Sequence, residues 1–240
     1  MTTEELFRND ANRLACEATI TAVGDAGIKL DRSVFYPQGG GQAGDAGVLR
    51  RADGAELVIV DTRKGVEPGC ILHVPAAGAD LAGWQVGQSV IATIDAARRS
   101  AHRRFHTATH LLCALVPHPV DGCSITAGYA RLDFHMTEPL DKDVLTAGIA
   151  RLVAAAHPVR QRWITEDELD ASPGLVRSMS VQPPRGQGRV RLVEVAGVDL
   201  QPCGGTHVDN TADIGAVVVT KIEKKSAKTR RVVLGFASPS

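Results

Sequence analysis

Hydrophobic and polar positions alternate along residues 14–94 in short stretches separated by glycine-rich turns. The stretches richest in β-forming residues are 14–23, 56–62, 70–74 and 89–95. A period of two is typical of strands that bury one face, and no helical period of useful length interrupts this region. The pattern predicts a small β-barrel or sandwich in the N-terminal part of the chain.

The pattern changes to a helical period at residue 96. Hydrophobic residues then recur at spacings of four, three, four and three, at Ala101, Phe105, Ala108, Leu112 and Leu115. This spacing predicts an amphipathic helix that Pro117 ends. A second helix is predicted over 142–157, with Asp141 as its N-cap.

Stretches typical of strands return around and after the second helix. They cover residues 131–134, 159–165, 189–195, 214–222 and 230–236. Helices grouped with several strands favour an α+β fold in which the helices pack on one face of an antiparallel sheet. We therefore expect a small β-barrel-like domain over 1–94 and an α+β domain over 95–240.

Composition adds an uneven distribution of charge to this picture. The chain has 240 residues and no net charge, with 27 basic and 27 acidic residues. Residues 1–94 hold 8 basic and 12 acidic residues (net −4), whereas 95–240 hold 19 and 15 (net +4). This asymmetry permits a polyanionic partner for the second half without requiring one.

The lack of an expected targeting signal and the cysteine usage favour a cytoplasmic protein. The first residues contain no basic segment followed by an apolar one, so no signal peptide is expected, and no apolar run is long enough to span a membrane. The five cysteines are scattered and form no CxxC pair. We therefore expect reduced thiols and no membrane association.

Two short motifs carry metal-binding side chains. His106 and His110, in HTATH, are four positions apart on the first predicted helix, so both imidazoles leave the same face. Cys203 and His207, in PCGGTH, are also four apart, in a segment too rich in glycine for a helix interior. Either pair alone is usually accidental. Together they supply four N/S donors, the usual complement of tetrahedral zinc, and predict a Zn²⁺ site.

These motifs carry a family resemblance. HTATHLL followed far downstream by CGGTHV resembles the editing domain of alanyl-tRNA synthetase and its free-standing relatives, the AlaX family. The segment FYPQGGGQAGDAG, over 35–47, is similar to the glycine-rich motif of the longer AlaX members. The match runs from about residue 14 to 236. One departure is Gln201-Pro202 before the cysteine, where synthetase domains usually carry an acidic residue and leucine.

The resemblance implies a function and a set of site residues. His106, His110, Cys203 and His207 would be zinc ligands in an aminoacyl-tRNA deacylase. It would hydrolyse the ester of a wrong amino acid on tRNA(Ala), chiefly serine and in second place glycine. No general base is evident near the motifs, and zinc could either act on the ester or hold the pocket in shape.

Several further residues are substrate-binding candidates. Thr109 matches a position that the family uses near substrate; the alternative is a hydroxyl bonded within its own helix. The glycine-rich segment offers four more candidates, which would form one wall of the aminoacyl pocket: Gly39, Gly40, Gly41 and Gln42. The alternative is that the glycines only form a turn that needs positive φ. Thr126 is a weaker candidate for sensing the hydroxyl of serine.

Basic clusters would serve tRNA phosphates. They are Arg98, Arg99, Arg103 and Arg104; Arg185, Arg189 and Arg191; and Lys221, Lys224, Lys225, Lys228, Arg230 and Arg231.

Two alternative functions share the zinc site. A hydrolase of another small ester or amide would not need these clusters, and a structural-zinc RNA-binding module would show no turnover.

Overall fold

A computed structural model describes residues 2–176, 179 and 188–237, so Arg185 lies outside the described residues. The chain splits into two compact units. The first contains Met1–Gly39 and Ala43–Ser100, and the second contains Gly40–Gln42 and Ala101–Ser240. The domain boundary between residues 94 and 95 that the sequence suggested stays a prediction. Each unit is described by itself below.

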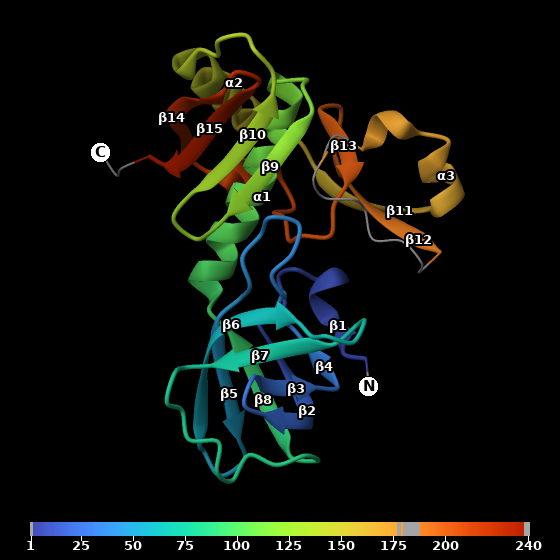
Figure 1. The fold of residues 1–240 in the computed structure, drawn as a ribbon, viewed down its shortest axis with the longest axis vertical. Coiled ribbons are helices and arrows are strands. Elements are labelled where there is room, and N and C mark those ends of the chain that lie inside the picture. Colours follow the sequence, from blue (N-terminus) through green and yellow to red (C-terminus); the bar gives the residue numbers. More distant parts are fainter. Residues whose placement is uncertain (1, 177–178, 180–187, 238–240) are drawn as a thin grey trace. The chain divides into compact units, whose positions relative to one another are not determined.

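The first unit is a closed six-stranded barrel, which confirms the expected β-barrel-like architecture (Figure 1). Its strands follow the order β2-β3-β7-β6-β5-β8, and inward residues such as Ile20, Leu49 and Ile59 fill the core. The barrel strands are β2 (Ala15–Gly24), β3 (Gly27–Leu30), β5 (Gly47–Arg51), β6 (Glu56–Lys64), β7 (Ile71–Pro75) and β8 (Ser89–Ile94). Strand β8 alternates exposed and buried residues without a break, which is the period that the sequence showed.

A short parallel pair accompanies the barrel. It joins β1 (Glu4–Glu5) to β4 (Arg32–Ser33), and the 3₁₀ turn η1 (Leu6–Arg8) follows β1.

The second unit contains two antiparallel sheets. The larger has the order β14-β15-β10-β9 and the smaller the order β11-β12-β13. Their strands are β9 (Val120–Ile125), β10 (Ala130–His135), β14 (Val217–Ser226), β15 (Thr229–Phe236), β11 (Val159–Thr165), β12 (Arg189–Val195) and β13 (Asp199–Pro202). Three α-helices and two 3₁₀ turns complete the described structure: α1 (Ala96–Leu115), α2 (Lys142–Ala154), α3 (Glu166–Asp170), η2 (Pro173–Leu175) and η3 (Thr211–Ile214).

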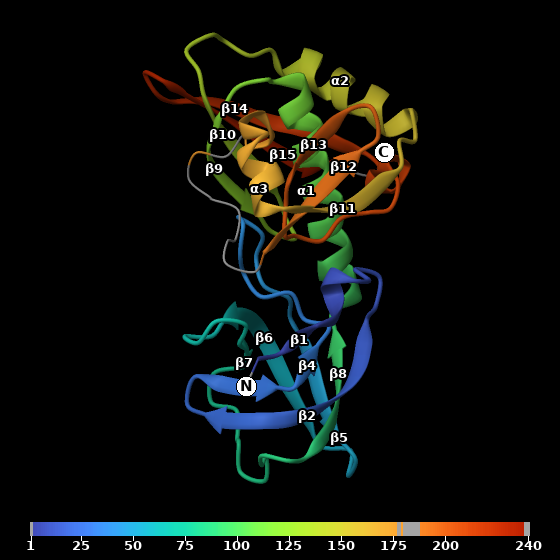
Figure 2. The same cartoon turned by 90° about the vertical axis from the view of Figure 1, so that its right-hand side faces the viewer.

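Helices α1 and α2 cover one face of the larger sheet, which confirms the α+β fold (Figure 2). Phe105 of α1 and Ile149 of α2 belong to the same apolar cluster as Phe134 and Leu234 of the sheet. Asp141 caps α2 as expected, because its side chain accepts from the backbone N–H groups of residues 143 and 144. The helix ends three residues before the predicted position 157, and Ala156 then has a φ of 52°. Among the described residues, no helix is long and apolar enough to cross a membrane.

The arginines of α1 mostly serve the protein's own structure. Arg99 is 1% exposed, pairs with Asp45 and donates to the backbone oxygens of residues 11 and 34. Arg98 donates to the Gly44 oxygen. In the second unit, Arg103 and Arg104 donate to the carbonyls of residues 207 and 214. Arg99 is therefore too buried to contact tRNA phosphates, whereas such a role for the other three arginines stays a prediction.

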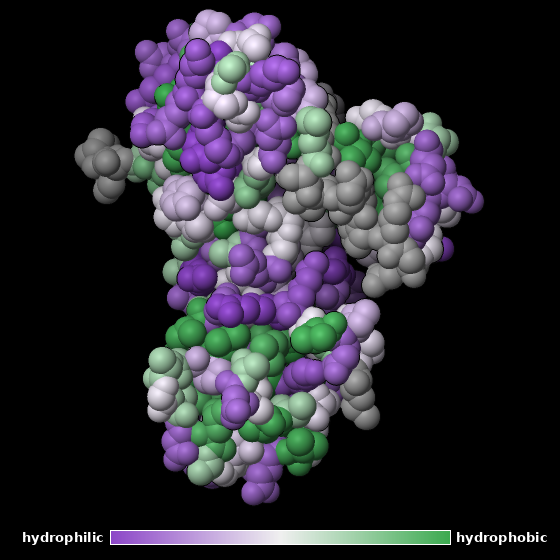
Figure 3. Space-filling model, viewed as in Figure 1, coloured by the Kyte–Doolittle hydropathy of each residue, from purple (hydrophilic) through white to green (hydrophobic). Residues whose placement is uncertain are grey.

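The other face of the larger sheet carries a cluster of charges around Asp133 of β10. Leu132 and Phe134 point into the core, so Arg131 and Asp133 point away from it. Asp133 is 1% exposed and contacts Arg131, Lys225 and Arg231 at 2.9, 2.8 and 2.7 Å. We call these four residues the Asp133 cluster. Figure 3 shows hydrophilic residues gathered where Figure 1 draws β14, β15 and β10.

The pKa of the Asp133 carboxyl reflects these partners. Burial acts to raise the pKa, but hydrogen bonds from Arg231 and Lys225 outweigh it and lower the pKa to about 2. Since this lies below the ordinary value of 3.8, the ionised carboxylate stabilises the fold above about pH 4. That stabilisation is lost as the pH falls through about 4 towards about 2.

We expect Asp133→Asn to lower the free energy of unfolding by about 2 kcal/mol at pH 7. The difference from the unsubstituted protein should shrink as the pH falls from about 4 to about 2. Urea unfolding of both proteins at several pH values measures it. Asp25→Asn, at an exposed position, is the control and should change stability little at any of these pH values. Equal stabilities of the Asp133 variant and the unsubstituted protein at pH 7 would contradict this account.

Candidate metal centre

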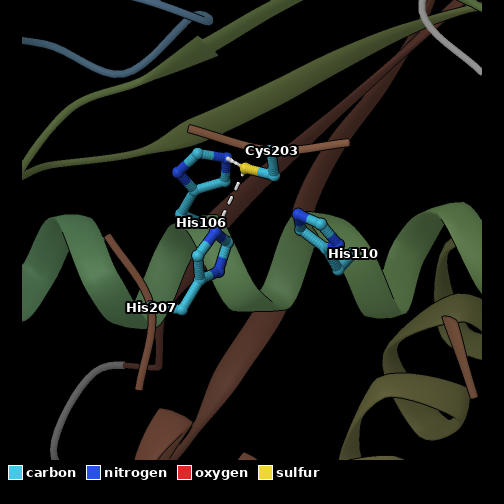
Figure 4. Close-up of side chains that lie close together, drawn as sticks. All are labelled: His106, His110, Cys203 and His207. Carbon is cyan, nitrogen blue, oxygen red and sulfur yellow. Dashed lines mark hydrogen bonds between the residues drawn. The ribbon is translucent and has the colours of Figure 1, made fainter. Parts of the chain in front are cut away.

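Four metal-binding side chains meet in the second unit (Figure 4). His106 and His110 come from α1, and Cys203 and His207 come from the loop that follows β13. Their candidate ligand atoms all lie within 4.8 Å of one another. The three imidazoles are at most 5% exposed. The structure thus brings together the two motifs that the sequence singled out.

Helix α1 presents its two histidines from one face because they are one turn apart. Phe105, Ala108 and Leu112 of the same helix are buried in the apolar cluster, which fixes how the helix is rotated. His106 and His110 lie at the edge of that apolar stripe, with their ring centroids 5.7 Å apart.

The loop that carries Cys203 and His207 depends on a glycine at residue 205. A β-carbon there would lie inside the van der Waals radii of His106 Cε1 and Nδ1, and 2.9 Å from Gln42 Oε1. The glycine is therefore required by close approach to the helix.

Arg191 of β12 holds the same loop from the other side. Its guanidinium, in a residue only 5% exposed, donates to the carbonyl oxygens of Cys203 and Gly205 at 2.8 and 2.9 Å. The backbone N–H of Cys203 in turn donates to the Arg191 oxygen at 3.1 Å. Arg191 therefore orders the loop and is not a solvated basic residue.

The hydrogen bond of His106 determines which nitrogen faces the cluster. Its Nδ1 lies 2.7 Å from Gln42 Oε1. The backbone N–H of Thr206 donates to that same oxygen at 3.1 Å, which identifies the atom as the amide oxygen. An amide oxygen only accepts, so His106 Nδ1 carries the proton and Nε2 keeps its lone pair. His106 Nε2 lies 3.3 Å from Cys203 Sγ.

The other two imidazoles are held in the same way. His110 Nδ1 lies 2.8 Å from Asp199 Oδ2, and His207 Nδ1 lies 3.2 Å from Thr107 Oγ1. The Thr107 hydroxyl donates to the carbonyl of residue 103, so it accepts from His207. All three rings therefore direct Nε2 towards the cluster, which is the arrangement of histidines that bind a metal.

The charge states of the cluster also suit a cation. Burial acts to raise the pKa of the Cys203 thiol, but electrostatic interactions with the His106 and His207 imidazoles outweigh burial and hold this pKa well below its ordinary value. Burial holds the pKa of His207 well below its ordinary value. The pKa of His110 is raised to about 9, because bonds to Asp199 and Cys203 outweigh burial. A thiolate with imidazole donors fits zinc, and binding would displace the His110 proton.

The predicted substrate-binding residues mostly form local hydrogen bonds or turns. The Thr109 hydroxyl, 4% exposed, donates to the His106 carbonyl at 2.7 Å. Thr126 forms a local turn, accepting from residues 128 and 129 and donating to the carbonyl of 129. Gly40 and Gly41 have φ of 58° and 85°, and the Gly39 carbonyl accepts from the Tyr36 hydroxyl. The substrate roles of these residues stay predictions.

Sequence reasoning missed Asp199 and Thr107, and it assigned Arg191 to tRNA phosphates rather than to the Cys203–His207 loop. A signal for Asp199 existed, because residues 199, 201 and 203 alternate along an extended segment and so share a face. Gln201 on that face donates to Asp199 Oδ2 at 2.8 Å. No comparable pattern marked the structural role of Arg191, which is one of two arginines in its strand.

Two family models match parts of the chain. Residues 190–233 match the threonyl and alanyl tRNA synthetase second additional domain. Residues 7–98 match the class II (A) tRNA synthetases. The first match includes Cys203 and His207, whereas the histidines of α1 lie between the two matches.

Relatives match almost the whole chain. The alanyl-tRNA editing protein AlaX-M of Methanosarcina barkeri is 34% identical over 239 residues, which is 96% of this chain and 97% of the relative. AlaX-M of Saccharolobus solfataricus is 32% identical over 242 residues, with the same shares. The alanine–tRNA ligase of Halorubrum lacusprofundi is 32% identical over 96% of this chain but over only 25% of its own length. The chain therefore belongs to the AlaX family of alanyl-tRNA editing proteins.

Proposed function

We propose that this protein is a zinc-dependent deacylase that removes wrong amino acids from tRNA(Ala), chiefly serine and secondarily glycine. The buried cluster of His106, His110, Cys203 and His207 carries the proposal, because three imidazoles and a thiolate are directed at one point. The family supports alanyl-tRNA editing as the reaction. Such an activity would protect the fidelity of translation.

The four residues would hold the ion as one sulfur and three nitrogen donors. Zinc bound there would supply a Lewis acid for the ester carbonyl, an anchor for the α-amino group or a site that orients water. The chain's own contribution is to keep the three Nε2 atoms directed inward and to bury the three imidazoles away from solvent.

Discrimination against alanine needs a group that recognises a hydroxyl. A synthetic pocket built for alanine rejects serine poorly and cannot exclude the smaller glycine, so a second hydrolytic site is required. Thr109 suits this task, since its hydroxyl hydrogen is already donated to the His106 carbonyl. Its remaining lone pairs are acceptors, which can meet the hydroxyl of a seryl group or an ammonium group.

The Asp133 cluster supports tRNA as the partner. Three cations surround one buried carboxylate, so the cluster carries a net charge of +2 on the face of the sheet opposite α1 and α2. Lys225 is half exposed and Arg131 is 28% exposed, so both can reach a phosphate. Arg99 of α1 is buried and Arg103 is only 14% exposed, whereas Lys225 is half exposed, which makes this sheet face the better candidate for phosphodiester contacts.

A structural-zinc module that binds RNA is the second candidate function. Four protein donors usually describe a closed structural site, whereas catalysis needs an open position. The two functions differ in turnover, so a deacylation assay separates them.

We expect the purified protein to release serine from Ser-tRNA(Ala) much faster than alanine from Ala-tRNA(Ala), with Gly-tRNA(Ala) as the third substrate. Cys203→Ala should lower the rate by at least about 100-fold and reduce bound zinc, because a ligand is lost. The measurements are amino-acid release and metal content of both proteins. No release of serine above the Cys203→Ala level would refute the editing function. Equal zinc in both samples would remove Cys203 from the metal site.

We expect Lys225→Met and Arg131→Met each to weaken tRNA binding. Each change should also reduce the slope of log affinity against log salt concentration by about 1, because one phosphate contact is lost. Filter binding or fluorescence anisotropy at several salt concentrations measures both quantities. Lys142→Met is the matched control, since Lys142 is exposed at the start of α2. An equal loss in the control, or unchanged slopes in both variants, would remove the Asp133 cluster from the tRNA interface.

A further inference from the structure

We propose that Gln42, the last residue of the Gly-Gly-Gly-Gln segment, is a positioning residue of the metal centre. It fixes His106 and the Cys203–His207 loop in the geometry that binds the ion. This inference rests on the proposed zinc function and goes beyond it. It gives the segment a task other than walling the aminoacyl pocket.

Gln42 joins the two halves of the cluster through one amide group. Its Oε1 accepts from His106 Nδ1 at 2.7 Å and from the Thr206 backbone N–H at 3.1 Å. Its Nε2 donates to Thr206 Oγ1 at 3.0 Å. His106 comes from the helix and Thr206 from the loop. A single buried side chain therefore sets the spacing between the two elements that supply the donors.

The backbone of the segment is fixed where the amide needs it. The Ile125 N–H donates to the Gly41 oxygen at 2.7 Å, and Gln42 forms a parallel bridge with Ile125 on the edge strand β9. A β-carbon at residue 41 would lie 2.8 Å from Cys123 Sγ, and its φ of 85° also favours glycine. Gly41 thus lets the chain approach β9 closely enough for Gln42 to reach the cluster.

The position of Gln42 in the chain distinguishes it from the other residues that bind the imidazoles. Thr107 lies on the metal-bearing helix itself, and Asp199 lies on β13, which leads into the loop. Gln42 lies 64 residues before His106. It is therefore the contact through which the glycine-rich segment becomes part of the metal centre.

Removing the amide would leave two buried donors without an acceptor, His106 Nδ1–H and Thr206 N–H. His106 could then rotate or change tautomer, and the loop would lose its link to the helix. Loss of a group that orients a metal ligand typically lowers metal affinity by about 10–100-fold. A carboxylate at residue 42 keeps both acceptor functions, because the Thr206 hydroxyl can turn and donate to the second oxygen.

The test is zinc affinity of the full-length protein, measured by competition with a chelator in metal buffers. We expect Gln42→Met to weaken zinc binding by about 10–100-fold and Gln42→Glu to stay within a few-fold of the unsubstituted protein. Cobalt substitution gives a second readout. The visible absorption bands of tetrahedral Co²⁺ should shift or weaken in the Met variant and persist in the Glu variant.

Gln38→Met is the matched control, because Gln38 is exposed in the same segment; it should bind zinc normally. If the Gln42→Met protein fails to fold by circular dichroism, Gln42→Asn serves instead, since it keeps the amide but draws it back by one methylene. Normal zinc affinity with impaired deacylation in either variant would show that Gln42 contacts only substrate and would overturn this inference. If the unsubstituted protein binds no zinc, the proposed zinc function fails first, and the inference fails with it.

Discussion

The loop that carries Cys203 and His207 can reach α1 only because residue 205 has no side chain. The His106 ring occupies the space that a β-carbon would need, and Gln42 Oε1 lies against the same position. Every other feature of the site depends on this approach. The thiolate meets the His106 and His207 nitrogens, Arg191 can bind the loop carbonyls from behind, and Gln42 can accept from helix and loop together.

The geometry of the site depends on the hydrogen-bond acceptors that hold the imidazoles as much as on the metal-binding side chains themselves. An amide, a hydroxyl and a carboxylate each accept a hydrogen bond from one Nδ1–H, so the three imidazoles all direct Nε2 towards the cluster. Because imidazole can bind a metal through either nitrogen, spacing along a helix does not by itself decide which one points inward. The acceptors decide it, and they lie on a glycine-rich segment, on α1 and on β13.

The parts of this structure that could be predicted are those with a local period or a short spacing. Alternation along β8 and the four-three spacing of α1 predicted the barrel and the helix, and the paired motifs HTATH and PCGGTH predicted which donors would meet. Contacts over long separations left no such pattern. Arg99 and Arg191 look like surface charges in the sequence, yet both are buried because distant carbonyls and side chains satisfy them. The contact of Gln42 with His106 belongs to the same class.

The separations between paired residues have a consequence for how the protein is made. His106 is held from 64 residues away, His110 from 89 and His207 from 100. A ribosome completes α1 long before it adds Cys203 and His207, so the helix emerges with Gln42 already made but without Asp199 and the other two donors. In a zinc finger the ion folds a local segment, but an ion held by these four residues would bind only after the chain has brought distant strands together. An ion that needs all four donors would therefore bind only after the chain has been made as far as residue 207 and its two distant segments have met.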